Sequence, residues 1–209
     1  MEPNFGIATG AYVEVRDEWP ESIGRAAREG WPFLELTAVG GSRLDLLATI
    51  DTASLAPFER VSVHTPSRGY TAEELLIGVR ALPFTCDLVL HPDVWRDDRL
   101  AELGERAVFE NMDLNKEYGR SVDDLAEVFA RFPHAGFCLD VAHVWTNDTS
   151  LALGHELLDA FGDRLRQLHV SGIDPDGTHR DMTKADLERY APLLERCRFV
   201  PWLLEGLLV

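Results

Sequence analysis

The feature that most constrains the fold of this chain is a regular alternation of short apolar runs with segments of helical period. Eight runs rich in β-branched or apolar residues are bounded by turn signals, and each is predicted to be a strand. The predicted strands cover residues 5–13, 31–39, 60–65, 86–91, 107–112, 136–141, 165–171 and 200–205. A strand and a helix thus recur about every 26 residues in a chain of 209.

The segments between the strands carry helix signals. Thr71 with Glu74, and Ser121 with Asp124, form capping-box patterns at the start of two segments. The predicted helices cover residues 22–29, 43–58 (interrupted), 71–82, 98–106, 121–132, 150–161 and 183–196.

Parallel strands joined by crossover helices favour an α/β fold, and eight such units close into a (β/α)8, or TIM, barrel. We therefore predict one compact TIM-barrel domain over residues 1–209. An open, doubly wound sheet is the alternative, and it would lack pairing between the first and last strands. Only four residues follow Glu205, so the last helix is predicted to be missing. We expect the apolar residues Leu207 and Leu208 either to cover the gap in the outer ring or to meet a partner subunit.

Charge and cysteine content bear on partners and compartment. The net charge of −16 makes nucleic acid an unlikely partner, because a polyanion would be repelled. The three cysteines, Cys86, Cys138 and Cys197, have no CxxC spacing and are expected to be reduced and structural. The sequence has no basic leader and no apolar run of membrane-spanning length, so we expect a cytoplasmic protein with no membrane contact. A homo-oligomer is left open.

Six consecutive predicted strands carry a residue of a type that binds metals at or near their C-terminal ends. These residues are His64, His91, Glu110, Asp140, His169 and Glu205. In a TIM barrel the C-terminal strand ends point to one face, where catalytic groups of this fold are found. One polar strand end is ordinary, but six in succession indicate a site. His143 and His179 follow two of these strands and join the set, whereas His134 and His155 are expected to lie elsewhere.

Imidazoles and carboxylates without cysteine form a mixed nitrogen and oxygen ligand set. Such a set suits Zn, Mn, Fe or Co better than Ca or Mg. We expect Zn or Mn, with one to three ions, and Glu110 is placed to bridge two of them. Because the ligands bind in their deprotonated forms, metal affinity should fall as the pH drops through the histidine range.

The order of the motifs resembles a known family. The motifs are VSVHTP, LVLHPD, VFENMD, FCLDVAH, LHVSG, a following TH and a terminal WLLEG. Together they are similar to the xylose isomerase-like TIM barrels. That superfamily groups sugar and sugar-phosphate isomerases and epimerases with apurinic-site endonucleases of the endonuclease IV type. The resemblance covers roughly residues 60–206.

The resemblance implies two ligand sets. In the epimerase branch one divalent ion is bound by residues that correspond to Glu110, Asp140, His169 and Glu205. In the endonuclease branch the same four bind zinc, and a three-zinc cluster is completed by residues that correspond to His64, His91, His143 and His179. The DxH carboxylate of that branch has no match, because Gly177 stands two residues before His179. Whether Asp176 completes a third metal site is left open.

The first functional hypothesis is a metal-dependent isomerase or epimerase for a small sugar, sugar phosphate or polyol. The ion would hold a carbonyl and its neighbouring hydroxyl and stabilise an enediolate. Glu110 and Glu205, which resemble the paired glutamates of the epimerases, would remove and return the proton. His143 would orient a substrate hydroxyl.

The alternative is a metal-cluster phosphoesterase, in which a metal-activated hydroxide attacks phosphorus. His64 and His91 favour it, whereas the acidic composition counts against a DNA substrate. A metal-binding or scaffold protein without activity is a third possibility.

Three further residues are candidate substrate contacts. Arg180 would contact a phosphate or hydroxyl group, with a salt bridge to Asp181 or Asp176 as the alternative. Trp95 and Trp145 would wall a sugar pocket, with loop packing as the alternative.

Overall fold

The fold is a closed barrel of eight parallel strands. The computed structural model describes residues 4–15, 18–38, 43–67, 69–94 and 96–209. The barrel strands are β1 (Phe5–Ala8), β2 (Phe33–Thr37), β3 (Arg60–His64), β4 (Asp87–Leu90), β5 (Ala107–Glu110), β6 (Gly136–Asp140), β7 (Leu165–Val170) and β10 (Trp202–Leu204). β1 pairs with both β2 and β10, which closes the ring. The predicted TIM barrel is therefore confirmed, and the open sheet is wrong.

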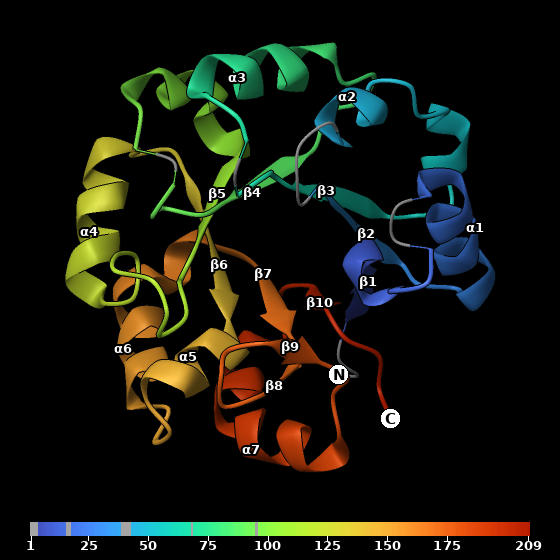
Figure 1. Cartoon of the computed structure of the whole chain (residues 1–209). Coiled ribbons are helices and arrows are strands. Elements are labelled where there is room, and N and C mark those ends of the chain that lie inside the picture. The colour runs from blue at the N-terminus through green and yellow to red at the C-terminus, as the bar shows by residue number, and fades with distance from the viewer. Residues whose placement is uncertain (1–3, 16–17, 39–42, 68, 95) are drawn as a thin grey trace.

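Helices surround this ring of strands (Figure 1). The α-helices are α1 (Trp19–Glu29), α2 (Arg43–Leu47), α3 (Ala72–Ala81), α4 (Val122–Arg131), α5 (Val141–Asn147), α6 (Ala152–Phe161) and α7 (Lys184–Leu194). The 3₁₀ helices are η1 (Thr9–Ala11), η2 (Thr52–Leu55), η3 (Asp98–Arg106), η4 (Gly162–Arg164) and η5 (Glu195–Cys197). Both predicted capping boxes are present, and Thr183 with Asp186 forms a third at α7.

Several local features differ from the sequence prediction. The first predicted strand, residues 5–13, ends at Ala8 because η1 follows at once. The segment Asp98–Arg106 is 3₁₀ and contains a non-helical residue, Gly104. Helix α5 was not expected, because its seven residues continue directly from β6 without a turn signal; the side chain of Asp140 caps it by accepting from the His143 N–H.

The two faces of each barrel strand meet different surroundings. In β2, Leu34 and Leu36 belong to the main hydrophobic core, whereas Glu35 meets side chains from β3 and β7. The small separate cluster of Val89, Val108 and Cys138 comes from three adjacent strands. Since side chains alternate across a strand, the barrel interior combines a few apolar residues with buried polar ones.

The loop after β7 contains a short hairpin that the sequence did not predict. Its strands are β8 (Gly172–Ile173) and β9 (His179–Arg180), which pair antiparallel. This hairpin brings His179 back beside the C-terminal end of β7, where the side chain of Ser171 contacts it.

Residues 205–209 form no helix, as predicted. Instead the Met182 N–H donates to the Leu207 carbonyl at 2.7 Å, and the Val209 N–H donates to the Met182 carbonyl at 3.0 Å. Leu207 packs against the core, while Leu208 stays 46% exposed. The tail is thus held by the segment before α7.

Among the described residues, no helix combines the length and apolar character that a lipid bilayer crossing requires.

Candidate active site

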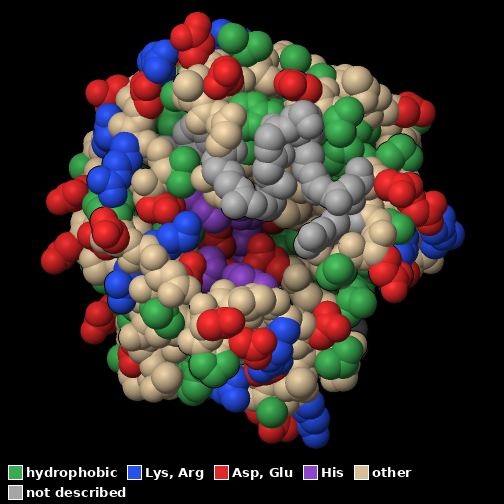
Figure 2. All heavy atoms as spheres, in the orientation of Figure 1, with side chains coloured by type: hydrophobic (Ala, Val, Ile, Leu, Met, Phe, Trp, Pro, Cys, Tyr) green, Lys and Arg blue, Asp and Glu red, His purple; other side chains and the backbone are tan. Residues whose placement is uncertain are grey.

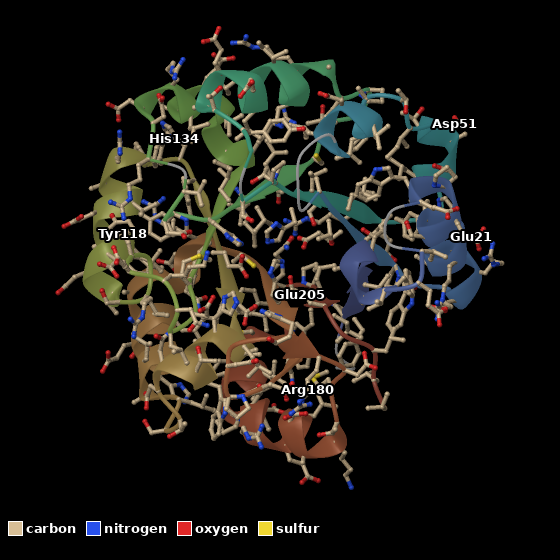
Figure 3. The ribbon with its side chains drawn as sticks, in the orientation of Figure 1. Glu21, Asp51, Tyr118, His134, Arg180 and Glu205 are labelled. Atoms are coloured by element: carbon tan, nitrogen blue, oxygen red, sulfur yellow. The ribbon has the colours of Figure 1, made fainter. Side chains whose placement is uncertain are left out.

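The predicted ligands gather on one face of the barrel. Figure 2 shows histidine and acidic side chains clustered in a central hollow of this face. The hollow is a cavity of about 260 Å³, and its described lining includes His64, His91, Glu110, His143, His179 and Glu205. Glu205 is labelled within the ring of strands in Figure 3. Parallel strands of a barrel end at the same face, which explains why residues from such distant parts of the sequence meet.

Glu110, His169 and Glu205 form one group within the cluster. The Nδ1 atom of His169 lies 2.8 Å from Oε1 of Glu110 and 3.4 Å from Oε1 of Glu205. His169 is fully buried and the Glu110 side chain is 1% exposed, whereas the Glu205 side chain is 16% exposed. Of the two glutamates, Glu205 is thus more accessible from the cavity.

His64 and His91 stand beside Glu110 on the other side. Their Nε2 atoms lie 3.4 and 3.2 Å, respectively, from Oε2 of Glu110. The two Nε2 atoms are 3.2 Å from each other. His64 Nδ1 faces the Thr65 carbonyl at 3.1 Å, so a proton on Nδ1 leaves the Nε2 lone pair directed at this cluster.

Asp140, His143 and His179 form a third group. Their potential ligand atoms all lie within 4.8 Å of one another. His143 Nδ1 is 2.8 Å from the Asn111 carbonyl, and its Nε2 is 3.0 Å from Nε2 of His179. The Asn111 side chain also bonds to both backbone polar groups of Asp140, at 2.8 and 3.0 Å, and so fixes the end of β6.

Three buried carboxylate oxygens face histidine nitrogens without a regular hydrogen bond, and this arrangement suits a metal ion. Oε2 of Glu110, Oδ2 of Asp140 and Oε2 of Glu205 are buried without a hydrogen bond of regular geometry. Two nitrogens bound tetrahedrally at about 2.05 Å from one ion would lie about 3.3 Å apart. The observed separations of 3.2 and 3.0 Å in the two histidine pairs are close to this value. Unpaired carboxylate oxygens and converging imidazoles are a donor set for a divalent cation of the Zn or Mn type.

The charges of the cluster shift the pKa values of its members. Burial opposes protonation of His64 and His179, but the neighbouring Glu110 and Glu205 outweigh it and raise their pKa values to about 9 and about 10, respectively. Burial raises the pKa of Asp140 to about 6, and the charge of Glu205 adds to this effect. For Glu110 and Glu205 burial acts upward, yet the adjacent histidines hold both pKa values below the ordinary value. The carboxylates therefore attract positive charge, as protons on histidine or as a cation.

Of the predicted substrate contacts, His143 lines the cavity, whereas Arg180 and Trp145 lie away from it. The guanidinium of Arg180 is held by Asp186 at 2.8 Å and Asp174 at 3.2 Å, so its salt bridges are with these residues rather than with Asp181 or Asp176. Trp145 packs under the guanidinium of Arg189, at 4.6 Å. Neither Arg180 nor Trp145 is among the described residues lining the cavity. Trp95 lies outside the described residues.

Asp176, His134 and His155 do not join the cluster of ligand-type residues. The carboxylate of Asp176 is exposed and accepts from the Thr178 N–H at 2.9 Å, rather than joining His179. His134 precedes β6 at the end opposite Asp140, and His155 lies on α6, as predicted. Figure 3 shows His134 at the periphery.

Sequence reasoning missed two residues that support the ligands. Asn111 directly follows Glu110, and its role depends on contacts across to β6 that spacing does not reveal. Glu35 is fully buried inside the barrel. Its signal was visible, because a charged residue between Leu34 and Leu36 in a buried strand requires an explanation.

Comparisons with known proteins identify the fold. No protein-family model and no curated relative matches the chain. Among solved structures, a D-tagatose 3-epimerase-like protein superposes with a TM-score of 0.64 and 13% identity, covering 97% of this chain and 90% of that one. A D-allulose 3-epimerase from Methylomonas sp. gives 0.61 and 16%, covering 97% and 84%. A 3-keto-D-glucoside 4-epimerase from E. coli gives 0.61 and 12%, covering 100% and 93%.

These likenesses show the fold alone: the chain is a TIM barrel over nearly its whole length, as its alternation of strands and helices predicted.

Proposed function

We propose that this protein is a divalent-metal-dependent epimerase or isomerase acting on a small sugar or polyol. The observation that carries the proposal is the pair of glutamates, Glu110 and Glu205, which both line the cavity and both lie within 3.4 Å of Nδ1 of His169. Epimerases on the same fold support the assignment.

Glu110, Asp140, His169 and Glu205 would hold the ion. A bound divalent cation would polarise a substrate carbonyl and stabilise negative charge beside it. The cavity of about 260 Å³ is small, which favours a small substrate.

The two glutamates would exchange a proton with the substrate carbon. Their depressed pKa values keep both ionised at neutral pH, so each can accept a proton. Removal by one glutamate and return by the other, from opposite sides, inverts the carbon. His143 would orient a substrate hydroxyl through Nε2, because the Asn111 carbonyl engages its Nδ1.

Separate Glu110→Gln and Glu205→Gln variants test this assignment. We expect the wild type, loaded with Mn²⁺ or Zn²⁺, to epimerise at least one member of a ketose panel and to introduce solvent deuterium at the inverted carbon. Each variant should lose turnover by about 10³-fold or more, within the range that general acid–base catalysis supplies together with ligand loss. Metal content is measured for each variant, and His134→Asn serves as the control.

Full turnover by either metal-loaded variant would contradict the proton-transfer roles. Epimerisation that introduces no deuterium from the solvent, although it is lost in both variants, would contradict removal of the proton by one glutamate and return by the other.

A metal-cluster phosphoesterase is the second candidate function. It is favoured by two further ligand groups, one of His64, His91 and Glu110 and the other of Asp140, His143 and His179. One ion per chain would favour the epimerase, and two or three would favour the phosphoesterase. Hydrolysis of a phosphate ester by the metal-loaded protein, lost in His64→Ala, would decide for the second candidate.

A further inference from the structure

A buried carboxylate lies beneath the candidate metal site and belongs to none of the ligand groups. Glu35 is in the middle of β2 and is fully buried, as is His169. Nε2 of His169 lies 3.1 Å from both carboxylate oxygens of Glu35. The other ring nitrogen, Nδ1, faces Glu110 and Glu205. The imidazole of His169 thus contacts the site through Nδ1 and the carboxylate of Glu35 through Nε2.

The hydrogen bonds around Glu35 indicate where the ring proton lies. Oε2 of Glu35 accepts from Ser62 Oγ at 3.0 Å and from Gln167 Nε2 at 2.7 Å. Gln167 Nε2 is also 3.0 Å from His169 Nε2, but its shorter contact is with the carboxylate. Oε1 of Glu35 has no other hydrogen bond. An ionised carboxylate only accepts, so a proton on Nε2 of His169 satisfies this arrangement.

Stability alone does not explain the position of Glu35. Burying a carboxylate is costly, and apolar residues of similar volume often replace buried charges without loss of stability. Elsewhere in the barrel, Val89 on β4 and Val108 on β5 belong to a small buried apolar cluster. A metal-binding histidine, in contrast, generally needs a partner that orients its second nitrogen.

We propose that Glu35 is a positioning residue that holds His169 as the Nε2–H tautomer and directs the Nδ1 lone pair toward the divalent cation. Ser62 and Gln167 hold the carboxylate in place for this contact. The inference rests on the proposed function only in that His169 binds a metal ion.

Zinc affinity, measured by chelator competition, tests the role of Glu35. Glu35→Leu removes the acceptor and should weaken Zn²⁺ binding about 10- to 100-fold, as loss of such partners does at other sites. Glu35→Gln keeps an oxygen that can accept from Nε2–H, so it should recover most of that loss. Ser62→Ala removes one donor to Glu35 without touching His169 and should have a smaller effect.

A matched control separates positioning from general destabilisation. Asp186 is equally buried, but it serves Arg180 and the cap of α7. Asp186→Asn should lower the urea midpoint while leaving the Zn²⁺ affinity unchanged. If Asp186→Asn weakens Zn²⁺ binding as much as Glu35→Leu at equal destabilisation, the positioning role is overturned.

The ring spectrum of His169 gives a test on the wild-type protein that does not depend on the folding of the Glu35 variants. Long-range ¹H–¹⁵N NMR of the metal-free protein, assigned with His169→Gln, should show a proton on Nε2. A ring protonated only at Nδ1, or wild-type Zn²⁺ affinity in folded Glu35→Leu, overturns the proposal. A wild type that binds no divalent ion while its ring carries the Nε2 proton overturns the proposed function and, with it, the metal-directing role of Glu35.

Discussion

The raised pKa of His64 predicts that the metal-free protein loses stability in mildly alkaline solution. The ordinary pKa of histidine is 6.5, and Glu110 raises that of His64 to about 9 against the effect of burial. A group with a raised pKa stabilises the fold fully below its unfolded pKa and loses that contribution as the pH rises through the folded pKa. The contribution of His64 is therefore present at pH 6.5 and is lost between about pH 7 and pH 10.

The magnitude follows from the two pKa values. At about 1.4 kcal/mol for each pH unit, the interval from 6.5 to about 9 corresponds to about 3.5 kcal/mol, of which about 3 kcal/mol is lost between pH 6.5 and pH 9.5. His64 is 4% exposed, so solvent does little to screen its interaction with Glu110.

Urea unfolding followed by tryptophan fluorescence measures this change. With a chelator present, the free energy of unfolding of the wild type should fall by about 3 kcal/mol more than that of His64→Asn between pH 6.5 and 9.5. His134→Asn, altered at the opposite end of β6, should keep the wild-type pH dependence. Equal pH dependence in wild type and His64→Asn would refute the assigned charge interaction.

Bound Zn²⁺ should counteract the loss of stability that the metal-free protein shows at alkaline pH. Because the ion competes with the protons on His64 and His179, Zn²⁺ affinity should keep rising up to about pH 9. From the sequence, metal affinity was predicted to fall as the pH drops through the ordinary pKa range of histidine. Glu110 and Glu205 raise the pKa values of His64 and His179, so the fall in affinity should begin at a higher pH.

Two further substitutions test the support of the site and the barrel. Asn111→Ala removes both hydrogen bonds between the Asn111 side chain and the Asp140 backbone, and it should cost about 2–3 kcal/mol in urea unfolding and weaken Zn²⁺ binding. A cost below about 0.5 kcal/mol would contradict the role of these two hydrogen bonds. Gly6→Ala places a Cβ 2.6 Å from the Phe33 carbonyl oxygen, so it should lower the free energy of unfolding in urea by about 1–3 kcal/mol. Its control is Gly162→Ala, whose Cβ meets nothing within 4 Å and which should be neutral or stabilising. Equal effects of the two substitutions would contradict the close approach of β1 and β2.

Local sequence determined the strand and helix alternation and the placement of the metal-type residues at strand ends. Capping by Thr71 and Ser121 and the apolar runs act within a few residues, so their outcome could be predicted without tertiary contacts. The eightfold repeat then limited the chain to very few folds, and the barrel places the ends of its parallel strands on one face.

Tertiary structure decided which side chains meet. Closure through β1 and β10, the hairpin that returns His179, and the salt bridges that occupy Arg180 all depend on contacts between distant segments. The same is true of Glu35, whose partners His169 and Gln167 are more than a hundred residues away in sequence. Local pattern marks a residue as a ligand type, but only the closed barrel fixes the direction of each ring nitrogen and carboxylate, because those directions are set by hydrogen bonds across strands.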